Sequence, residues 1–366
     1  MRSGISAHVW TVALVFAAVA AVSQPAAADD RQECLKTSRE TAAAAIAPCT
    51  RAIESGEYEG RDLSDLYHHR GYTWSWTSAA DRVDRAFEDY TEAIRVDPKA
   101  VSSLLNRANI YNERHDYDSA IVDANQAFES GLSDHGKAVG YQARGNAYQA
   151  KGDYDHAIAD FSESIRLDAN NKVTLVNRGN AYLAKGDPDR AIADYDQVIA
   201  LNPKSAIAYY NRALAYRDKG DVDRVIGDCS QAIALFPRYR DAYLNRGYAY
   251  QIKKDFDRAI ADYSQTIALD PQDRDPYGRR AVAYLSKGDL GRSIADYSQV
   301  LPWTLMLTIF MMCVVVGVWP NLRRSASARG RPGAAVEIGE QELVEMRRRN
   351  AALERIAAAL AKHSPA

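Results

Sequence analysis

The sequence is poor in cysteine: its 366 residues contain only Cys34, Cys49, Cys229 and Cys313. Four cysteines are too few for a disulfide framework, and none stands in the Cys-x-x-Cys spacing typical of zinc sites. The formal net charge is only −2, so no global field favours nucleic acid or an anionic surface. Nucleophile elbows, phosphate loops and dinucleotide fingerprints are also missing. We therefore expect a protein that is not an enzyme and that uses no metal or cofactor and binds no nucleic acid.

An apolar segment near the beginning of the sequence predicts export from the cytoplasm. Arg2 precedes an apolar run from Val9 to Val22, and Ala26-Ala27-Ala28 offers a cleavage site of small residues. This order is typical of a signal peptide, which we assign to residues 1–28. An uncleaved anchor is the alternative.

A second apolar segment predicts one transmembrane helix at residues 301–320. No charge occurs between Leu301 and Trp319, and at about 1.5 Å per helical residue this stretch spans a hydrocarbon core of about 30 Å. Arginines in the basic linker at 321–336 indicate the cytoplasmic side. We expect a single-pass inner-membrane protein whose preceding region is periplasmic and whose tail is cytoplasmic. A buried core helix is the alternative for this segment.

The tail, residues 337–363, has a strongly helical composition. Leu343, Met346, Asn350 and Leu353 follow a heptad seam, and Asn at such a position favours a two-stranded coiled coil. The tail therefore predicts a homodimer. An amphipathic helix on the inner membrane surface is an equally good interpretation.

The region from 64 to 300 repeats with a period of 34 residues. It contains about seven units, the last one truncated, and capping helices at 29–63 precede them. Each unit reads as two helices, because apolar and small residues recur at three- and four-residue spacing. Gly-Asp turns separate the two helices and prolines separate the units. These markers are Gly152, Gly186, Gly220 and Gly288, and Pro98, Pro203, Pro237 and Pro271.

The repeated unit resembles the tetratricopeptide repeat. A small residue recurs in the first helix and an aromatic residue follows three positions later: Gly71, Ala108, Gly145, Gly179, Ala213, Gly247 and Ala281, then Trp74, Tyr111, Tyr148, Tyr182, Tyr216, Tyr250 and Tyr284. The resemblance implies an all-α fold, a right-handed α-solenoid of stacked helical hairpins, to which the transmembrane helix and the C-terminal helix would be added.

One feature departs from that family. Its members usually have Leu just before the small residue, whereas all seven units here have Arg, and all seven have Asp in the second helix. We expect a structural ladder of Arg–carboxylate pairs within or between units. Independent solvated charges are the alternative. The residues are Arg70, Arg107, Arg144, Arg178, Arg212, Arg246 and Arg280, with Asp89, Asp123, Asp160, Asp194, Asp228, Asp262 and Asp296.

Stacked hairpins leave a concave surface lined by the first helices. By resemblance to the family, Asn at two positions there binds the backbone of an extended peptide, and Tyr adds flat apolar contact. Solvated Asn side chains are the alternative. The candidate groove residues are Asn106, Asn109, Asn146, Asn177, Asn180, Asn211 and Asn245, with Tyr141, Tyr209, Tyr210 and Tyr243.

Cys34 and Cys49 lie 15 residues apart in the predicted cap. Outside the cytoplasm we expect them to form a disulfide, with two buried free thiols as the alternative. The adjacent pair His68-His69 is a poor metal site on a helix. Together these features predict a periplasmic, membrane-tethered scaffold or adaptor that binds peptide segments or helices of other proteins. A transmembrane relay, with the repeats as sensor and the tail as cytoplasmic dimeriser, is the second hypothesis.

Overall fold

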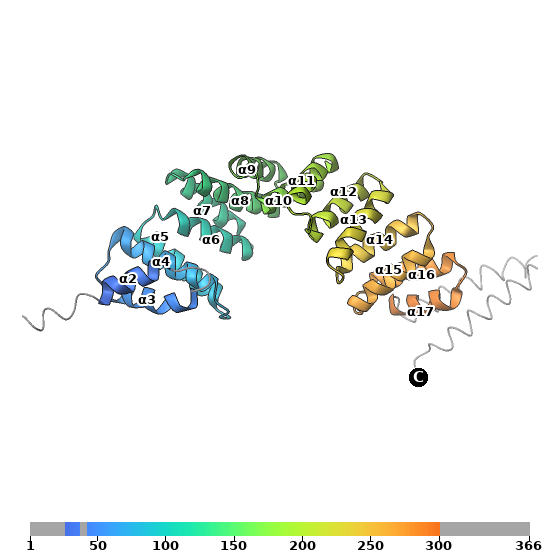
Figure 1. The fold of residues 1–366 in the computed structure, drawn as a ribbon, viewed down its shortest axis with the longest axis horizontal. Helices are drawn as coiled ribbons and strands as arrows, with labels where there is room; N and C mark the ends of the chain where they lie inside the picture. Colours follow the sequence, from blue (N-terminus) through green and yellow to red (C-terminus); the bar gives the residue numbers. More distant parts are fainter. Residues whose placement is uncertain (1–25, 37–41, 301–366) are drawn as a thin grey trace, which may run out of the picture. The chain divides into compact units, whose positions relative to one another are not determined.

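The structure, a computed structural model, describes residues 26–36 and 42–300, and within these ranges every regular element is a helix (Figure 1). The all-α class predicted from the repeats is confirmed for this part of the chain. The helices are α2 (Ala26–Leu35), α3 (Ala42–Glu54), α4 (Gly60–Ser75), α5 (Arg82–Val96), α6 (Val101–Glu113), α7 (Tyr117–Glu129), α8 (Asp134–Ala150), α9 (Tyr154–Leu167), α10 (Lys172–Ala184), α11 (Pro188–Leu201), α12 (Ala206–Asp218), α13 (Val222–Leu235), α14 (Arg240–Ile252), α15 (Phe256–Leu269), α16 (Asp275–Ser286) and α17 (Leu290–Val300).

The chain forms two compact units, residues 1–194 and residues 195–366, and the boundary falls inside α11. In the first unit, α4 with α5, α6 with α7 and α8 with α9 form helical hairpins. In the second, α12 with α13, α14 with α15 and α16 with α17 do the same. We call the even-numbered helices from α4 onwards the first helices and their odd-numbered partners the second helices.

The turn inside each hairpin follows from its sequence. Gly152, Gly186, Gly220 and Gly288 adopt φ between +76° and +79°, a left-handed conformation that only glycine takes at no steric cost. The next residue is Asp, and its carboxylate accepts a hydrogen bond from the backbone N–H three residues later, as Asp153 does from His156. The pair thus ends one helix and begins the next.

The hairpins pack through small residues of the first helix. At Gly145 an added Cβ would lie 2.7 Å from Cε1 of Phe161, and at Gly247 it would lie 2.9 Å from Cε1 of Tyr263. Both rings are fully buried. Glycine therefore allows a large ring of the second helix to lie directly against the first helix. In α12 and α13 the same two positions hold Ala213 and Cys229, so a larger first-helix residue meets a smaller partner.

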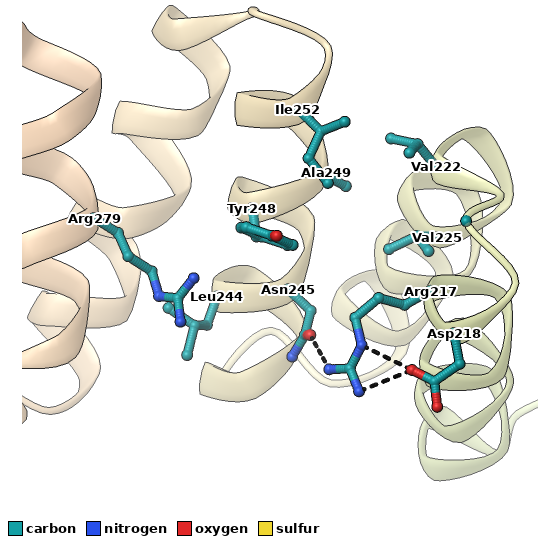
Figure 2. A pocket seen from close by; sticks show the side chains of 11 residues that line it. Arg217, Asp218, Val222, Val225, Leu244, Asn245, Tyr248, Ala249, Ile252 and Arg279 are labelled. Atoms are coloured by element: carbon teal, nitrogen blue, oxygen red, sulfur yellow. Dashed lines mark hydrogen bonds and ion pairs between the residues drawn. The ribbon is translucent and has the colours of Figure 1, made fainter. Parts of the chain in front are cut away.

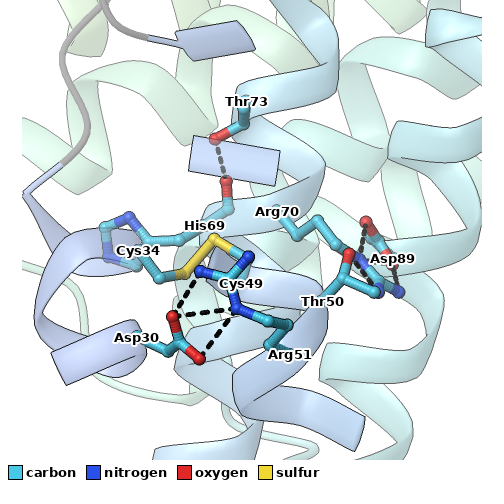
Figure 3. The surroundings of a disulfide bond; sticks show 9 residues. All are labelled: Asp30, Cys34, Cys49, Thr50, Arg51, His69, Arg70, Thr73 and Asp89. Atoms are coloured by element: carbon cyan, nitrogen blue, oxygen red, sulfur yellow. Dashed lines mark hydrogen bonds and ion pairs between the residues drawn. A yellow bond between two sulfur atoms is a disulfide. The ribbon is translucent and has the colours of Figure 1, made fainter. Parts of the chain in front are cut away.

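A disulfide joins the first two described helices (Figure 3). Cys34 of α2 and Cys49 of α3 are bonded and fully buried, and they pack with Ala52 and with Leu66 of α4. Arg51 donates to Asp30 through Nε and Nη2, and Arg31 donates to Asp62 at 2.6 Å. The α2–α3 hairpin thus covers the apolar side of α4.

Several sequence-based predictions fall outside the described residues. These are residues 1–25 of the signal peptide assigned to 1–28, whose last three residues begin α2, and also the transmembrane helix at 301–320, the basic linker and the dimerising tail. Within 26–36 and 42–300, no helix has the length and apolar content needed to cross a membrane. The membrane topology and the dimer therefore stay predictions.

Candidate functional site

The ladder residues meet within each hairpin. In six of the seven pairs, Nε and Nη2 of the arginine each donate to one oxygen of the aspartate, at 2.6–2.9 Å. Arg70 and Asp89 form the same arrangement with distances of 2.7 and 3.0 Å. The seven aspartates are only 3–7 % exposed. Each pair thus connects a first helix to its own second helix in a bidentate geometry. They are Arg70–Asp89, Arg107–Asp123, Arg144–Asp160, Arg178–Asp194, Arg212–Asp228, Arg246–Asp262 and Arg280–Asp296.

The same arginines also reach back to the preceding hairpin. Nη1 of Arg178 donates to the Ser162 hydroxyl at 3.1 Å, and Nη1 of Arg246 donates to that of Ser230 at 3.0 Å. The other acceptors are Thr50, Thr91, Asn125, Asp196 and Ser264. Each guanidinium therefore connects the helix that carries it to the next helix and to the previous one. Its hydrogen bond to Asp194 raises the pKa of Arg178 despite partial burial, so this group stays charged.

The predicted groove tyrosines lie against the ladder. The guanidinium of Arg212 lies 5.5 Å from the Tyr209 ring, and that of Arg246 lies 5.5 Å from the Tyr243 ring. Tyr141 packs on Phe128, with ring centroids 4.6 Å apart. All three are half-buried. These rings cover the ladder with a cation–π contact, and only part of each is open to a ligand.

The predicted groove asparagines of the first unit come together in two places. Nδ2 of Asn177 donates to Oδ1 of Asn146 at 2.9 Å, which links α10 to α8. Asn106 and Asn109 line a small cleft of 260 Å³ with Tyr72. Asn180 is half-buried in the same unit, as Asn211 is in the second. Peptide binding by these amides stays a prediction.

The second unit contains a cleft of 560 Å³ between α12, α13, α14 and α16 (Figure 2). Tyr248, Ala249 and Ile252 of α14 lie on one side, opposite Val222 and Val225. Tyr248 is 39 % exposed and Ile252 is 50 % exposed. Apolar side chains of α14 are therefore exposed to solvent inside the cleft.

Polar groups lie beside these apolar walls. Nη1 of Arg217 donates to Oδ1 of Asn245 at 3.1 Å, and its Nε and Nη2 donate to Asp218 at 3.3 and 3.2 Å. Nδ2 of Asn245 donates to the Asp241 carbonyl and to the Tyr210 hydroxyl. Arg279 of α16 lies 5.4 Å from the Tyr248 ring. Asn245, a predicted groove residue, thus lines this cleft, and Tyr210, another one, supports Asn245 from behind through its hydroxyl.

Sequence reasoning missed the apolar half of the site. The position two residues after the ladder arginine is Tyr72 in α4 and Asn109, Asn146 and Asn180 in the next three first helices. In the second unit it is Leu214, Tyr248 and Val282. Alignment at the 34-residue period shows this change from amide to apolar, but only the asparagines suggested a site. Arg279 stands where Asn106, Asn177, Asn211 and Asn245 stand in other units, so the search for asparagines passed over it. The position of Arg217 has no common residue type, so no repeat pattern marked it.

The other chemically notable residues are packed. Burial lowers the pKa of His68 to about 4, and His68 Nδ1 lies 3.0 Å from the Ser103 hydroxyl. Burial raises the pKa of the Cys229 thiol to about 12, so this cysteine is not a nucleophile at neutral pH. No group of His, Cys, Asp and Glu suited to a metal ion occurs in the described part of the chain.

Two tetratricopeptide repeat family models match the sequence. One matches residues 78–133 and 176–224, and the other matches residues 138–171 and 241–273. The chain belongs to the tetratricopeptide repeat family. The resemblance inferred from the small, aromatic and turn positions is therefore confirmed. This tetratricopeptide repeat protein differs from the usual family pattern in its ladder arginines, which the geometry above explains. No curated protein is similar enough in sequence to count as a relative.

Solved tetratricopeptide repeat structures share the fold. One from Parabacteroides merdae is 19 % identical, with 64 % of this chain and 91 % of that chain covered and a TM-score of 0.50. The C-terminal part of another from Cytophaga hutchinsonii is 20 % identical, with 65 % and 94 % covered and a TM-score of 0.50. The MamA protein is 30 % identical over 44 % of this chain and 89 % of that one, with a TM-score of 0.43. Family and fold together support a protein-interaction scaffold.

Proposed function

We propose that this chain is a protein-interaction scaffold that binds segments of partner proteins in the cleft of its second unit. The observation that carries the proposal is the exposure of Tyr248 and Ile252 inside a walled cleft. Partly open aromatic and aliphatic side chains beside a few polar groups are typical of binding sites. Burial of such side chains supplies most of the energy at an interface.

The hydrogen-bonding groups of the cleft suit a peptide. The N–H groups of Arg217 and the amide of Asn245 lie next to the apolar walls. Each carries more hydrogen-bonding positions than a single contact uses. A bound segment would place a side chain against Tyr248 and Ile252 and its backbone carbonyls near Arg217.

We also propose that the chain acts outside the cytoplasm, as a membrane-tethered adaptor. The Cys34–Cys49 bond supports this location, because disulfides persist in oxidising compartments and are rare in the cytosol. Alkylation of intact cells tests it: both thiols should react with maleimide only after reduction. Labelling of Cys34 or Cys49 without reductant would contradict this part of the proposal.

Site-specific photo-crosslinking tests the binding function. A photoreactive phenylalanine is placed in the full chain at Tyr248 or at Ile252, and at Ile207 as a control. Ile207 is 54 % exposed on α12 of the same unit and does not line the cleft. We expect protein adducts from the two cleft positions and not from the control. Equal adducts at all three positions, or none, would contradict the proposal.

A further inference from the structure

The cleft of the second unit combines apolar walls with an excess of arginine. Three charged side chains line it, and they are Arg217, Arg279 and Asp218. The two arginines lie on opposite sides of Tyr248 (Figure 2). A ligand that crosses Tyr248 therefore meets a guanidinium before and after the apolar surface.

Both arginines keep donor capacity towards the cleft. Arg279 uses only its Nε in the 2.7 Å hydrogen bond to Asp275. Arg217 shares its contacts between a neutral amide and a half-exposed carboxylate. A guanidinium has five N–H groups, and its planar fork suits carboxylates in particular. Negative charge on the ligand is thus favoured at two points, one on either side of an apolar contact.

The apolar surface is not a constant feature of the repeat, since the same position holds Tyr72 in α4 and asparagine in the next three first helices. Tyr248 and Val282 occupy the position that holds Asn in α6, α8 and α10. Val282 is 38 % exposed and Leu285, also on α16, is 48 % exposed. Exposed apolar residues therefore continue from α14 to α16, where α6, α8 and α10 have amides.

We propose that the partner segment of this cleft is a peptide with an aliphatic or aromatic side chain flanked by acidic residues. The inference rests on the proposed function and deepens it by naming the chemistry of the partner. The apolar side chain lies between Tyr248 and Ile252 on one side and Val222 on the other. The flanking carboxylates bind Arg217 and Arg279.

Binding of labelled peptides to the full chain tests the ligand chemistry by fluorescence anisotropy. The probe is a short peptide with a central Leu-Phe pair between glutamates. One comparison peptide has glutamines for the glutamates, and another has serines for the Leu-Phe pair. We expect each comparison peptide to bind about tenfold more weakly or worse, which corresponds to about 1.4 kcal/mol or more. Equal affinities for the three peptides overturn the inference.

Matched variants test the location. Ile252→Asn and Tyr248→Asn should each weaken the binding of the acidic peptide about tenfold. Tyr248→Asn introduces the residue that α8 has at the equivalent position. Ile207→Asn, at an equally exposed isoleucine of the same unit, should not weaken this binding. Arg279→Gln should weaken the binding of the acidic peptide and leave the binding of the glutamine peptide unchanged. Arg258→Gln should affect the binding of neither peptide. Helical circular dichroism verifies that each variant is folded.

The outcomes separate the two proposals. If Tyr248 crosslinks to a partner but the acidic and glutamine peptides bind with equal affinity, this inference is overturned and the proposed function stands. Equal effects of Ile252→Asn and Ile207→Asn also overturn it. Self-association of the wild-type chain that Ile252→Asn abolishes would assign the cleft to a second copy and would likewise overturn it.

Discussion

At the scale of single residues, the ladder arginine is the most connected group of the repeat. Its aspartate is almost fully buried, and a buried carboxylate without a partner is costly. Replacement of both partners by apolar residues removes the charge as well as the bond. We therefore expect the pair to fix the register of the two helices more than it adds to net stability.

A double-mutant cycle tests this coupling. We expect Arg178→Ala and Asp194→Ala each to lower the free energy of unfolding by about 3 kcal/mol, because each leaves one buried charge unpaired. The double variant should cost clearly less than the sum, as measured by urea unfolding. The exposed pair Arg166–Glu163 is the control, and its loss should cost at most about 1 kcal/mol. Additive effects at Arg178 and Asp194 would contradict the coupling.

The sequence predicted these pairs but not the third bond of each arginine. Arg and Asp recur in all seven units, so repetition alone made them visible. The acceptor of Nη1 is Thr91, Asn125, Ser162 or Asp196 in successive units. Any side-chain oxygen can accept a hydrogen bond from Nη1. The acceptor position therefore has no common residue type that would mark it in the sequence.

At the scale of helices, the first and second helix of a hairpin adjust to each other's volume. Gly71, Gly145 and Gly247 face buried rings, whereas Ala213 pairs in position with Cys229. The last hairpin has Ala281 with Tyr297, and Tyr297 is only half-buried. In these hairpins, an aromatic ring of the second helix therefore lies opposite alanine instead of glycine only where the ring is not fully buried.

This adjustment of volumes predicts that the same glycine-to-alanine substitution changes the free energy of unfolding in opposite directions in two backgrounds. Gly247→Ala should lower the free energy of unfolding by about 1 kcal/mol, because overpacking against Tyr263 costs more than the gain in helix propensity. In the Tyr263→Cys background the same substitution should raise it, since the methyl group then fills a cavity. Both effects are measured by urea unfolding.

Gly227→Ala is the control for helix propensity. No heavy atom lies within 4 Å of an added Cβ at this position in α13, so the substitution should raise the free energy of unfolding by about 1 kcal/mol. If Gly247→Ala were stabilising with Tyr263 in place, close packing would not be the reason for glycine there.

Helix positions were predictable from the turn residues, whereas the cleft was not. Gly and Asp act on their own backbone, so a local pattern reveals them. The cleft brings together Val222 of α13, Tyr248 of α14 and Arg279 of α16. Their proximity depends on how hairpins pack within the second unit. The separate positions carry no common signal along the chain.

At the scale of the whole chain, the repeat is continuous in sequence where the two units meet. The division inside α11 has no Pro, Gly or linker that would have marked it. The first described hairpin differs from all others because it is covalently closed. Its stability therefore depends on the redox state of its surroundings, whereas α16 and α17 depend on packing alone.

Hydrogen exchange with and without a reductant tests this difference. A disulfide that closes a loop of about 15 residues contributes about 3 kcal/mol in the chain-entropy description. Reduction of Cys34–Cys49 should then speed amide exchange in α2 and α3 on the order of a hundredfold. Thr50 of α3 is also an acceptor for Arg70, so a smaller effect should reach α4.

The last hairpin supplies the internal control for that measurement. The helices α16 and α17 contain no cysteine, so their backbone amides should exchange at the same rate in both redox states. Because α17 packs chiefly on α16, both should exchange faster than α14 and α15, as expected for a terminal repeat. If reduction left α2 and α3 as protected as before, the apolar contacts of Ala52 and Leu66 would hold that hairpin without the disulfide. The bond would then indicate only an oxidising location and would contribute nothing to the stability of the fold.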